Sequence, residues 1–148
     1  WFAQPRAPQP RLRAQVRDYF GQLLRALAFL HGRGVLHRNL SPSNVLLDPA
    51  AGVVKVCDFA YSRALDTPLR PYSPEDPKLR AQSTREAKRL WYRAPELLLR
   101  QPVYGPATDA WSVGTLLAEA ACGEPLFASE SEIDHLFRIF RFTGSPSP

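Results

Sequence analysis

The sequence predicts an α+β domain that is mostly helical and contains one short β-hairpin. Apolar residues recur at three- and four-residue steps across residues 12–30 and again in the segment that follows Ser131. Such steps indicate amphipathic helices. The runs 45–47 and 53–57 are rich in Val and Leu and flank the turn-forming stretch DPAAG. Two short runs of this kind joined by a turn indicate a hairpin.

The chain is expected to begin with a lead-in and one long helix. Residues 1–9 are rich in proline, which favours an extended conformation. The helix follows from Pro10 and is expected to stop at Gly32 and Gly34, because glycine commonly ends helices. At 148 residues the chain is long enough to bury the core of one domain.

The second half contains a proline-rich loop and further helices. Residues 66–80 contain four prolines, which remove backbone donors, so we expect a long exposed loop there. Helical signals return at 95–99 and at 107–122, and the second of these is apolar on most faces, as in a buried helix. Ser131, with Asp134 three residues later, resembles a capping box at the start of the last helix.

Composition bounds the class of protein and its location. No apolar run approaches the ~20 residues that cross a bilayer. The chain lacks Met and a signal peptide, so we interpret it as a piece of a longer protein. Cys57 and Cys122 show no disulfide or zinc spacing, and we expect buried free thiols in an intracellular compartment, cytoplasmic or nuclear. The net charge is +5, but the arginines are scattered, so neither nucleic acid nor membrane is an expected partner.

Three motifs, in this order, resemble those of protein kinases. The first (HRNLSPSN, residues 37–44) resembles the catalytic loop, the second (DFA, residues 58–60) the metal-binding motif, and the third (LWYRAPE, residues 90–96) the end of the activation segment. Each pattern is weak alone. The three in sequence, with a strand pair between the first two, make a strong joint signal.

Further similarity narrows the resemblance. Residues 109–114 match the start of the buried central helix of kinases, and residues 131–137 are similar to a stretch of cyclin-dependent kinases and cyclin-dependent kinase-like proteins, the CMGC group. The resemblance implies a kinase-like fold in which residues 10–148 form part of the C-terminal lobe and stop before its last helices. It places the catalytic loop at 37–44 and the activation segment at 58–96, with the N-terminal lobe absent.

Three positions depart from the pattern of an active kinase. Asn39 stands where the family has the Asp that accepts or orients the substrate's proton, and a carboxamide has essentially no basicity. Ser41 replaces the catalytic-loop Lys, and Arg89 replaces a Thr that bridges the Asp and the Lys. Loss of a general base costs ~10²–10⁴ in rate, and groups that act as a unit lose most of their effect together. The resemblance therefore predicts impaired phosphotransfer.

The resemblance also implies binding of ATP and Mg²⁺. Asp58 and Asn44 match the family's metal ligands, and Leu46 matches the floor of the adenine pocket. The alternatives are that Asp58 caps a turn, Asn44 makes loop hydrogen bonds, and Leu46 is a core residue. No G-x-G-x-x-G motif occurs and no strand-borne Lys precedes residue 37, so the chain carries half of a nucleotide cleft.

Other matching positions imply structural roles. His37 and Phe59 match an internal packing spine, which makes His37 a core histidine and not a base. Asp109 matches a buried carboxylate that anchors the catalytic loop in the family. An unpaired buried charge is costly, which supports the expectation that Asp109 has this role. Glu96 matches one half of a family ion pair whose Arg partner would lie beyond the end of this sequence. The central helix contributes the expected core residues Trp111, Leu116 and Leu117.

The resemblance implies a regulatory site and a substrate pocket. Thr84 falls where cyclin-dependent kinase-like proteins carry a phosphorylated Thr, and Arg38 and Arg63 match two arginines that clasp its phosphate. Arg93 matches a residue that helps accept a Pro after the target Ser or Thr. Lys88 replaces the apolar wall of that pocket, which argues against proline-directed specificity.

These observations leave three functional hypotheses. The first is a pseudokinase, a folded module that acts by binding a regulatory protein partner. The second is a truncated piece of an active, ATP-dependent protein Ser/Thr kinase with a protein substrate and a cyclin-like activator. The third is the fragment of a decaying gene copy, which has no function. Whether the chain is an enzyme is therefore left open by the sequence.

Overall fold

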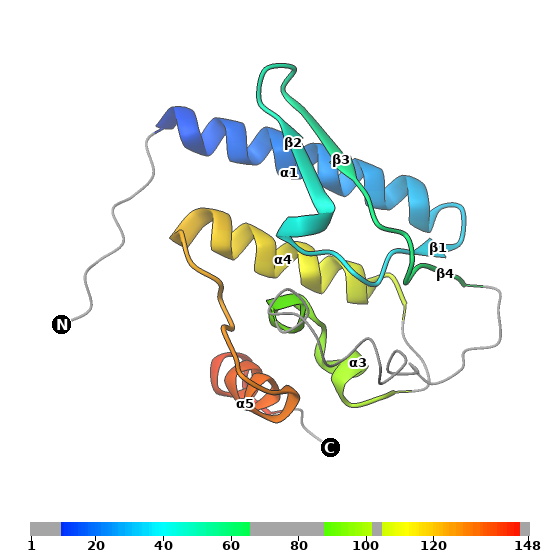
Figure 1. Cartoon of the computed structure of the whole chain (residues 1–148), viewed down its shortest axis with the longest axis vertical. Helices are drawn as coiled ribbons and strands as arrows, with labels where there is room; N and C mark the ends of the chain where they lie inside the picture. Colours follow the sequence, from blue (N-terminus) through cyan, green and yellow to red (C-terminus); the bar gives the residue numbers. More distant parts are fainter. Residues whose placement is uncertain (1–9, 66–87, 102–104, 146–148) are drawn as a thin grey trace.

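The computed structural model describes residues 10–65, 88–101 and 105–145, with side chains from Ala14 onward. Its elements are α1 (Pro10–His31), β1 (Val35–Leu36), η1 (Pro42–Asn44), β2 (Val45–Asp48), β3 (Val53–Val56), β4 (Arg63–Ala64), η2 (Leu90–Tyr92), α3 (Pro95–Leu98), α4 (Ala107–Cys122) and α5 (Glu132–Thr143). Helices α1 and α4 lie side by side, with the β2–β3 hairpin beside α1 (Figure 1). The elements η2, α3 and α5 lie on the other side of α4.

Helix α1 forms where the apolar periodicity predicted it. Leu23 and Leu27, one turn apart, are buried against Val113 and Leu116 of α4, so one face of α1 packs on the central helix. The helix ends at His31, and the chain then turns through Gly34, whose φ of 71° lies in the left-handed region. Glycine adopts that conformation without steric cost, which confirms the predicted stop.

The predicted hairpin is the antiparallel pair β2–β3. Its register pairs Val45 with Val56 and Asp48 with Val53. At the turn, the Asp48 carboxylate accepts the backbone N–H groups of Ala50 and Ala51, at 3.1 and 3.0 Å. This local bonding is typical of Asp in turns.

A single glutamine of α1 fastens the hairpin to the helix. The Gln22 Nε2 group donates to the carbonyl of Gly52 at 2.8 Å, and its Oε1 accepts the N–H of Val54 at 2.9 Å. The carboxamide thus bonds β3 in the way a neighbouring strand would, which positions the hairpin on α1.

A second two-stranded sheet differs from the expectation of one hairpin. Strand β1 pairs with β4, with Val35 opposite Ala64 and Leu36 opposite Arg63. Each strand has two residues, too few for alternation to be recognised in the sequence. The pair forms because the chain between them folds back, and it brings the segment after residue 58 beside the start of the 37–44 loop.

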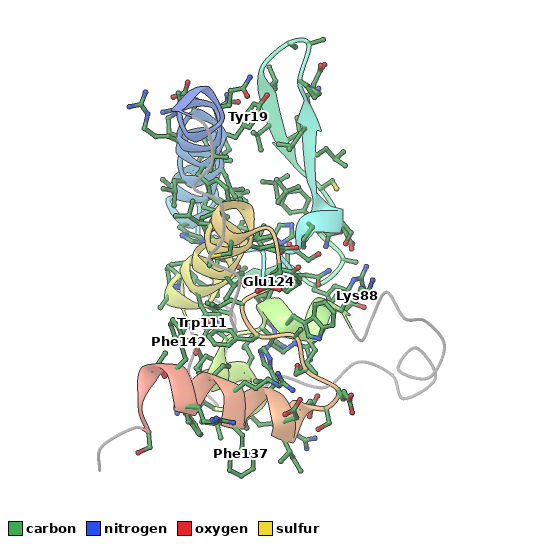
Figure 2. All side chains as sticks on the ribbon, turned by 90° about the vertical axis from the view of Figure 1, so that its left-hand side faces the viewer. Tyr19, Lys88, Trp111, Glu124, Phe137 and Phe142 are labelled. Carbon is green, nitrogen blue, oxygen red and sulfur yellow. The ribbon has the colours of Figure 1, made fainter. Side chains whose placement is uncertain are left out.

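The lower part of the fold has its own core. Leu90, Leu98, Phe127 and Ile139 form a buried cluster between η2, α3 and α5. Trp111 lies on the side of α4 that faces α5, whereas Phe137 points away from the fold (Figure 2). Among the described residues, no helix is long and apolar enough to cross a membrane.

The last helix begins with the predicted cap. The Ser131 hydroxyl accepts the N–H of Asp134 at 3.1 Å, as in a capping box. The returning bond differs from the standard pattern, because the Asp134 carboxylate accepts the N–H of Glu130, at 3.1 Å, one residue before the cap. The helix ends at Gly144, where φ is 86°.

Several expectations about burial are wrong. Cys57 is half-buried and Cys122 is exposed, so neither thiol is a core group. Leu117 is 44% exposed and is not a core residue, although Leu116 is buried. Helix α4 buries polar residues in its first half and exposes much of its second half, because its final turns extend past the elements that cover its start. The predicted lead-in 1–9 and proline-rich loop 66–80 lie outside the described residues.

We predict that Gln22→Ala lowers the free energy of unfolding by about 1–2 kcal/mol, because the part-buried N–H of Val54 loses its acceptor. Urea denaturation followed by circular dichroism measures the change. Gln15→Ala, at an exposed position of the same helix, is the matched control and should be neutral. An equal effect of both substitutions would contradict the role assigned to Gln22.

Candidate functional site

The 37–44 loop is held in place by a buried carboxylate of α4. Asp109 is fully buried, and its two oxygens accept the backbone N–H groups of His37 at 2.9 Å and Arg38 at 2.7 Å. His31, at the end of α1, donates to the same carboxylate from Nε2 at 2.8 Å. Arg38 has φ of 66°, an unfavourable conformation for a side chain of this size. The two loop bonds from Asp109 stabilise that conformation.

His37 joins this loop to the segment that follows β3. Its ring is fully buried, with Nε2 donating to the carbonyl of Cys57 at 3.0 Å and Nδ1 accepting the N–H of Asn39 at 3.3 Å. This pattern requires the neutral ring. Burial lowers the pKa of His37 below its usual range, although the Cys57 bond and the carboxylates of Asp109 and Asp58 oppose the shift.

The ring of His37 also contacts Phe59 edge to face, with ring centroids 5.0 Å apart. His37 therefore satisfies its polar groups within the core, as predicted, and has no free nitrogen with which to act as a base. Phe59 itself is 46% exposed, so the expectation that it is an internal packing residue is wrong for the described structure.

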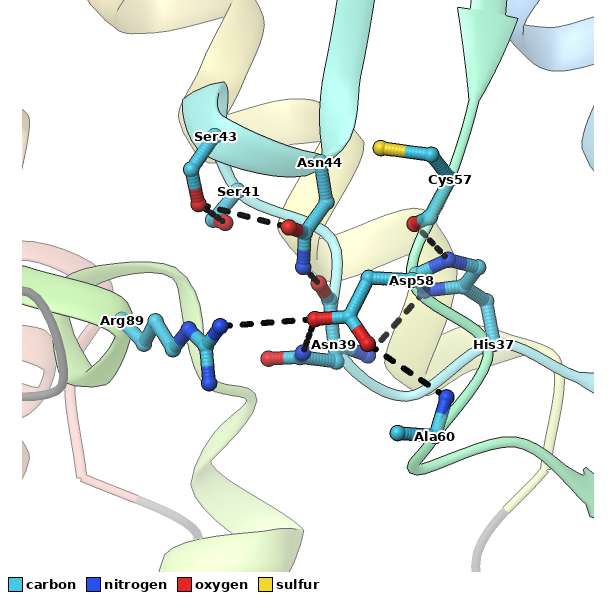
Figure 3. A network of polar contacts seen from close by, with 9 residues as sticks. All are labelled: His37, Asn39, Ser41, Ser43, Asn44, Cys57, Asp58, Ala60 and Arg89. Carbon is cyan, nitrogen blue, oxygen red and sulfur yellow. Dashed lines mark hydrogen bonds and ion pairs between the residues drawn. The ribbon is translucent and has the colours of Figure 1, made fainter.

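Asp58 receives two side-chain donors from different parts of the chain (Figure 3). The Asn39 Nδ2 group donates to Asp58 Oδ2 at 3.2 Å, and Arg89 Nη2 donates to the same oxygen at 3.3 Å. The other oxygen, Oδ1, accepts the N–H of Ala60 at 3.4 Å. The carboxylate is thus paired on both oxygens, with one neutral amide and one cationic partner on Oδ2.

Asn44 faces back into its own loop. Its Nδ2 donates to the carbonyl of Asn39 at 2.7 Å, and its Oδ1 accepts the hydroxyl of Ser43 at 3.4 Å. Ser41 is buried, and its hydroxyl bonds that of Ser43 at 3.0 Å. Both hydroxyls are therefore used in holding the turn η1 together.

The fold and these motifs agree with the comparison to known families. A family model for the protein kinase domain matches residues 8–146. The chain belongs to the protein kinase domain family. Its helices and small antiparallel sheets are consistent with the α+β fold expected for that family. Kinase domains generally use ATP with Mg²⁺ and bind protein substrates or regulators.

The side chains at the kinase metal position do not fit a Mg²⁺ site. Mg²⁺ needs oxygen lone pairs that converge in near-octahedral geometry, but Asp58 Oδ2 already accepts from Asn39 and Arg89, and Asn44 Oδ1 accepts from Ser43. The Asp58 and Asn44 side chains instead make the local bonds of the alternative interpretation.

Leu46, at the position of the adenine-pocket floor, is not a core leucine. It lies on β2 with its side chain 52% exposed. The alternative that explained Leu46 by burial is therefore wrong. An exposed apolar side chain at this point of the hairpin leaves a surface that a ligand or a neighbouring segment can cover.

The regulatory positions are only partly described. Thr84 lies outside the described residues. Arg63 lies in β4 opposite Leu36, two residues before Arg38, so the fold brings the backbones of the two arginines close together. Their proximity depends on the β1–β4 pair, which sequence patterns did not reveal.

The substrate-pocket positions lie on two sides of η2. Lys88 is exposed and, together with Ser41 and Arg89, lines a hollow of about 410 Å³. Arg93 is directed to α5, where its Nη1 lies 3.8 Å from the Glu132 carboxylate.

The remaining structural positions make buried contacts. Glu96 accepts the hydroxyl of Thr108 at 2.9 Å. Trp111 is partly buried and stacks on Phe127, with ring centroids 6.1 Å apart. These contacts connect α3 and the segment before α5 to the central helix.

Sequence reasoning missed three anchoring residues. His31 pairs with Asp109 across 78 positions. Glu119 accepts the Tyr92 hydroxyl at 2.6 Å, and burial together with this bond raises the pKa of Tyr92. His135 is fully buried, with Nε2 3.3 Å from the carbonyl oxygen of Arg93. No local pattern distinguishes these residues from surface ones, because each partner lies far along the chain.

We predict that Asp109→Ala lowers the free energy of unfolding by about 3 kcal/mol or more, since it strands the buried donors of His37, Arg38 and His31. Urea denaturation measures the loss. Asp18→Ala, which removes an exposed carboxylate from α1, is the control and should change stability little. A loss below about 1 kcal/mol for Asp109→Ala would mean that the loop does not depend on this carboxylate.

Two buried histidines, His37 and His135, should make the free energy of unfolding depend on pH. Burial lowers the pKa of His37 and of His135 below the ordinary value of 6.5, so the unfolded chain binds more protons just below that pH. Their contribution is fully present above about pH 6.5 and is lost as the pH falls towards the lowered pKa values. The slope is at most about 1.4 kcal/mol per pH unit for each histidine.

Urea denaturation at about pH 7.5, 6.5 and 5.5 tests this expectation, and the unfolding free energy should decrease at the lowest pH. His37→Gln retains a donor and an acceptor but cannot titrate, so it should flatten the curve even though it lowers the overall stability. A native chain whose stability is constant over this range would contradict the assignment.

Proposed function

We propose that this chain is a pseudokinase: a kinase-like domain of the cyclin-dependent kinase-like group that transfers no phosphate and acts by binding a regulatory protein partner inside the cell. The observation that carries the proposal is the pairing of Asp58 with Asn39 and Arg89. In an active kinase the corresponding Asp holds Mg²⁺ and a neighbouring carboxylate receives or orients the substrate's proton. Here the neighbour is an amide that donates to Asp58.

The position of the Asn39 side chain supports the proposal chemically. Its nitrogen is directed at Asp58, so the amide acts as a donor at this point. An amide oxygen can orient a hydroxyl, but it cannot take the proton from one. Ser41 offers a hydroxyl bonded to Ser43 where the family has a cationic Lys, so no positive charge from this position faces a developing phosphate charge.

The scaffold around these residues is intact, which supports a binding role. Asp109 and His37 anchor the start of the loop and the segment before Asp58 through bonds that do not involve the side chains of Asn39 or Ser41. The chain can therefore present a kinase-like surface independently of phosphotransfer. The C-terminal lobe alone would suffice for such a role, and ATP and Mg²⁺ would not be required.

A second candidate is a weakly active Ser/Thr kinase of which this chain is a piece. It is favoured by one specific observation: the bonds from Asp109 to His37 and from His37 to Cys57 hold the 37–44 loop beside Asp58. On this hypothesis a further segment would supply the rest of the ATP site and a cyclin-like activator would be a candidate partner.

Phosphotransfer by the longest natural product of the gene, measured with Mg-ATP and a Ser/Thr peptide library, distinguishes the two candidates. The pseudokinase proposal predicts turnover equal to that of Asp58→Ala. Restoration of Asp, Lys and Thr at positions 39, 41 and 89 should raise the rate by about 10²-fold or more if a complete cleft is present, because it returns a general base. Native turnover clearly above Asp58→Ala would overturn the proposal.

A further inference from the structure

The Arg89 side chain occupies the space in front of Asp58 from a distant part of the chain. Its Nη2 lies 3.3 Å from Asp58 Oδ2, and the side chains are 19% and 30% exposed respectively. The guanidinium carbon lies 5.9 Å from the centre of the Tyr61 ring. Arg89 is thus placed between an aromatic face and a carboxylate, and Figure 3 shows it approaching Asp58 from the side opposite His37.

We propose that the Arg89 guanidinium is the resident cation of Asp58 and that it excludes a divalent metal ion from this carboxylate. The proposal rests on the pseudokinase function and adds a detail to it. The positive charge beside Asp58 would come from an arginine side chain and not from a bound metal ion. The site would then be independent of Mg²⁺, whatever partner the surrounding surface binds.

The backbone that follows Arg89 is packed into the fold, which fixes the point from which the guanidinium extends. Arg89 is the residue that precedes η2, and the next residues, Leu90 and Tyr92, are buried. Trp91 donates from Nε1 to the carbonyl of Ser129 at 2.7 Å. These contacts hold the start of the side chain, which leaves its guanidinium end to reach Asp58.

Charge and geometry both oppose a metal at this carboxylate. A divalent cation bound to Asp58 would lie within a few ångströms of the guanidinium, where like charges repel strongly. Asn39 adds a second N–H donor to the same oxygen, and such donors occupy the lone pairs that Mg²⁺ would need. Arginine remains charged at any relevant pH, so neutralisation cannot relieve the repulsion.

The ion pair is mostly shielded from water, since the Arg89 and Asp58 side chains are 19% and 30% exposed. Replacement of Arg89 is therefore expected to lower stability as well as to change metal binding. Native-like ¹⁵N–¹H spectra of each variant check that it folds, which keeps the proposal testable by substitution.

The test uses Mn²⁺ as a probe on the full chain. Selective broadening of the backbone amide signals of Asp58 and Ala60 in ¹⁵N–¹H spectra reports binding at this carboxylate. The native chain should show none up to about 10⁻³ M Mn²⁺, the weak end of the range for oxygen-ligand sites. Arg89→Ala and Arg89→Thr should show this broadening within the same concentration range, because an adjacent positive charge has been removed.

Three further variants define the cause. Arg141→Ala removes an equal charge from an exposed position of α5 and should behave like the native chain. Arg89→Lys keeps the charge and should still exclude the ion. Arg89→Ala combined with Asp58→Asn should lose the binding gained by Arg89→Ala, which assigns the ion to the Asp58 carboxylate.

Two results would overturn the proposal. Binding of Mn²⁺ by the native chain as tightly as by Arg89→Ala would mean that the guanidinium moves aside. Absence of binding in both Arg89→Ala and Arg89→Thr, with native-like spectra, would mean that Arg89 is not what excludes the ion. Neither result bears on phosphotransfer, since a chain that binds Mn²⁺ still lacks the base and the Lys at positions 39 and 41.

Discussion

The buried carboxylate of Asp109 is the interaction on which the rest of the site depends. A charge in the interior is tolerated only when donors surround it, and the three donors here come from the end of α1 and from two consecutive backbone amides of the loop. The same bonds therefore fix α1, the loop and α4 relative to one another. They also stabilise the left-handed conformation of Arg38, which would otherwise be unfavourable.

The geometry of the site follows from that anchor through His37. Because Asp109 holds the backbone of His37, the buried ring is positioned to donate to the carbonyl of Cys57. Cys57 directly precedes Asp58, so the carboxylate is placed by a chain of two hydrogen bonds that starts in α4. Asp58 itself has φ of 65°, and its carboxylate accepts the Asn39 amide once this arrangement has brought the two segments together.

Local sequence patterns predicted the helices and the hairpin well, but they did not predict the long-range contacts between these elements. The extent of α1, the β2–β3 hairpin and the cap at Ser131 could be inferred from the sequence, because periodicity, turn chemistry and capping act over a few residues. The bonds of Gln22 to the hairpin and the β1–β4 pair could not, since each joins segments about 30 positions apart. Leu117 was misassigned for the same reason: its periodicity is that of a buried helix, but the described elements leave 44% of it exposed.

For the candidate site too, the sequence identified the residues but not their contacts. The motif residues could be identified by type, yet the pairing of Arg89 with Asp58 depends on how η2 packs and has no signature in the sequence. Asp109 and His37 are fully buried, so replacing either would strand polar groups in the core. Asn39 and Arg89 are partly buried, and neither bonds the Asp109 carboxylate or the His37 ring nitrogen that contacts Cys57. The bonds that anchor the loop are therefore distinct from the Asn39 and Arg89 side-chain bonds to Asp58, so the anchor can form whichever side chains stand at positions 39 and 89.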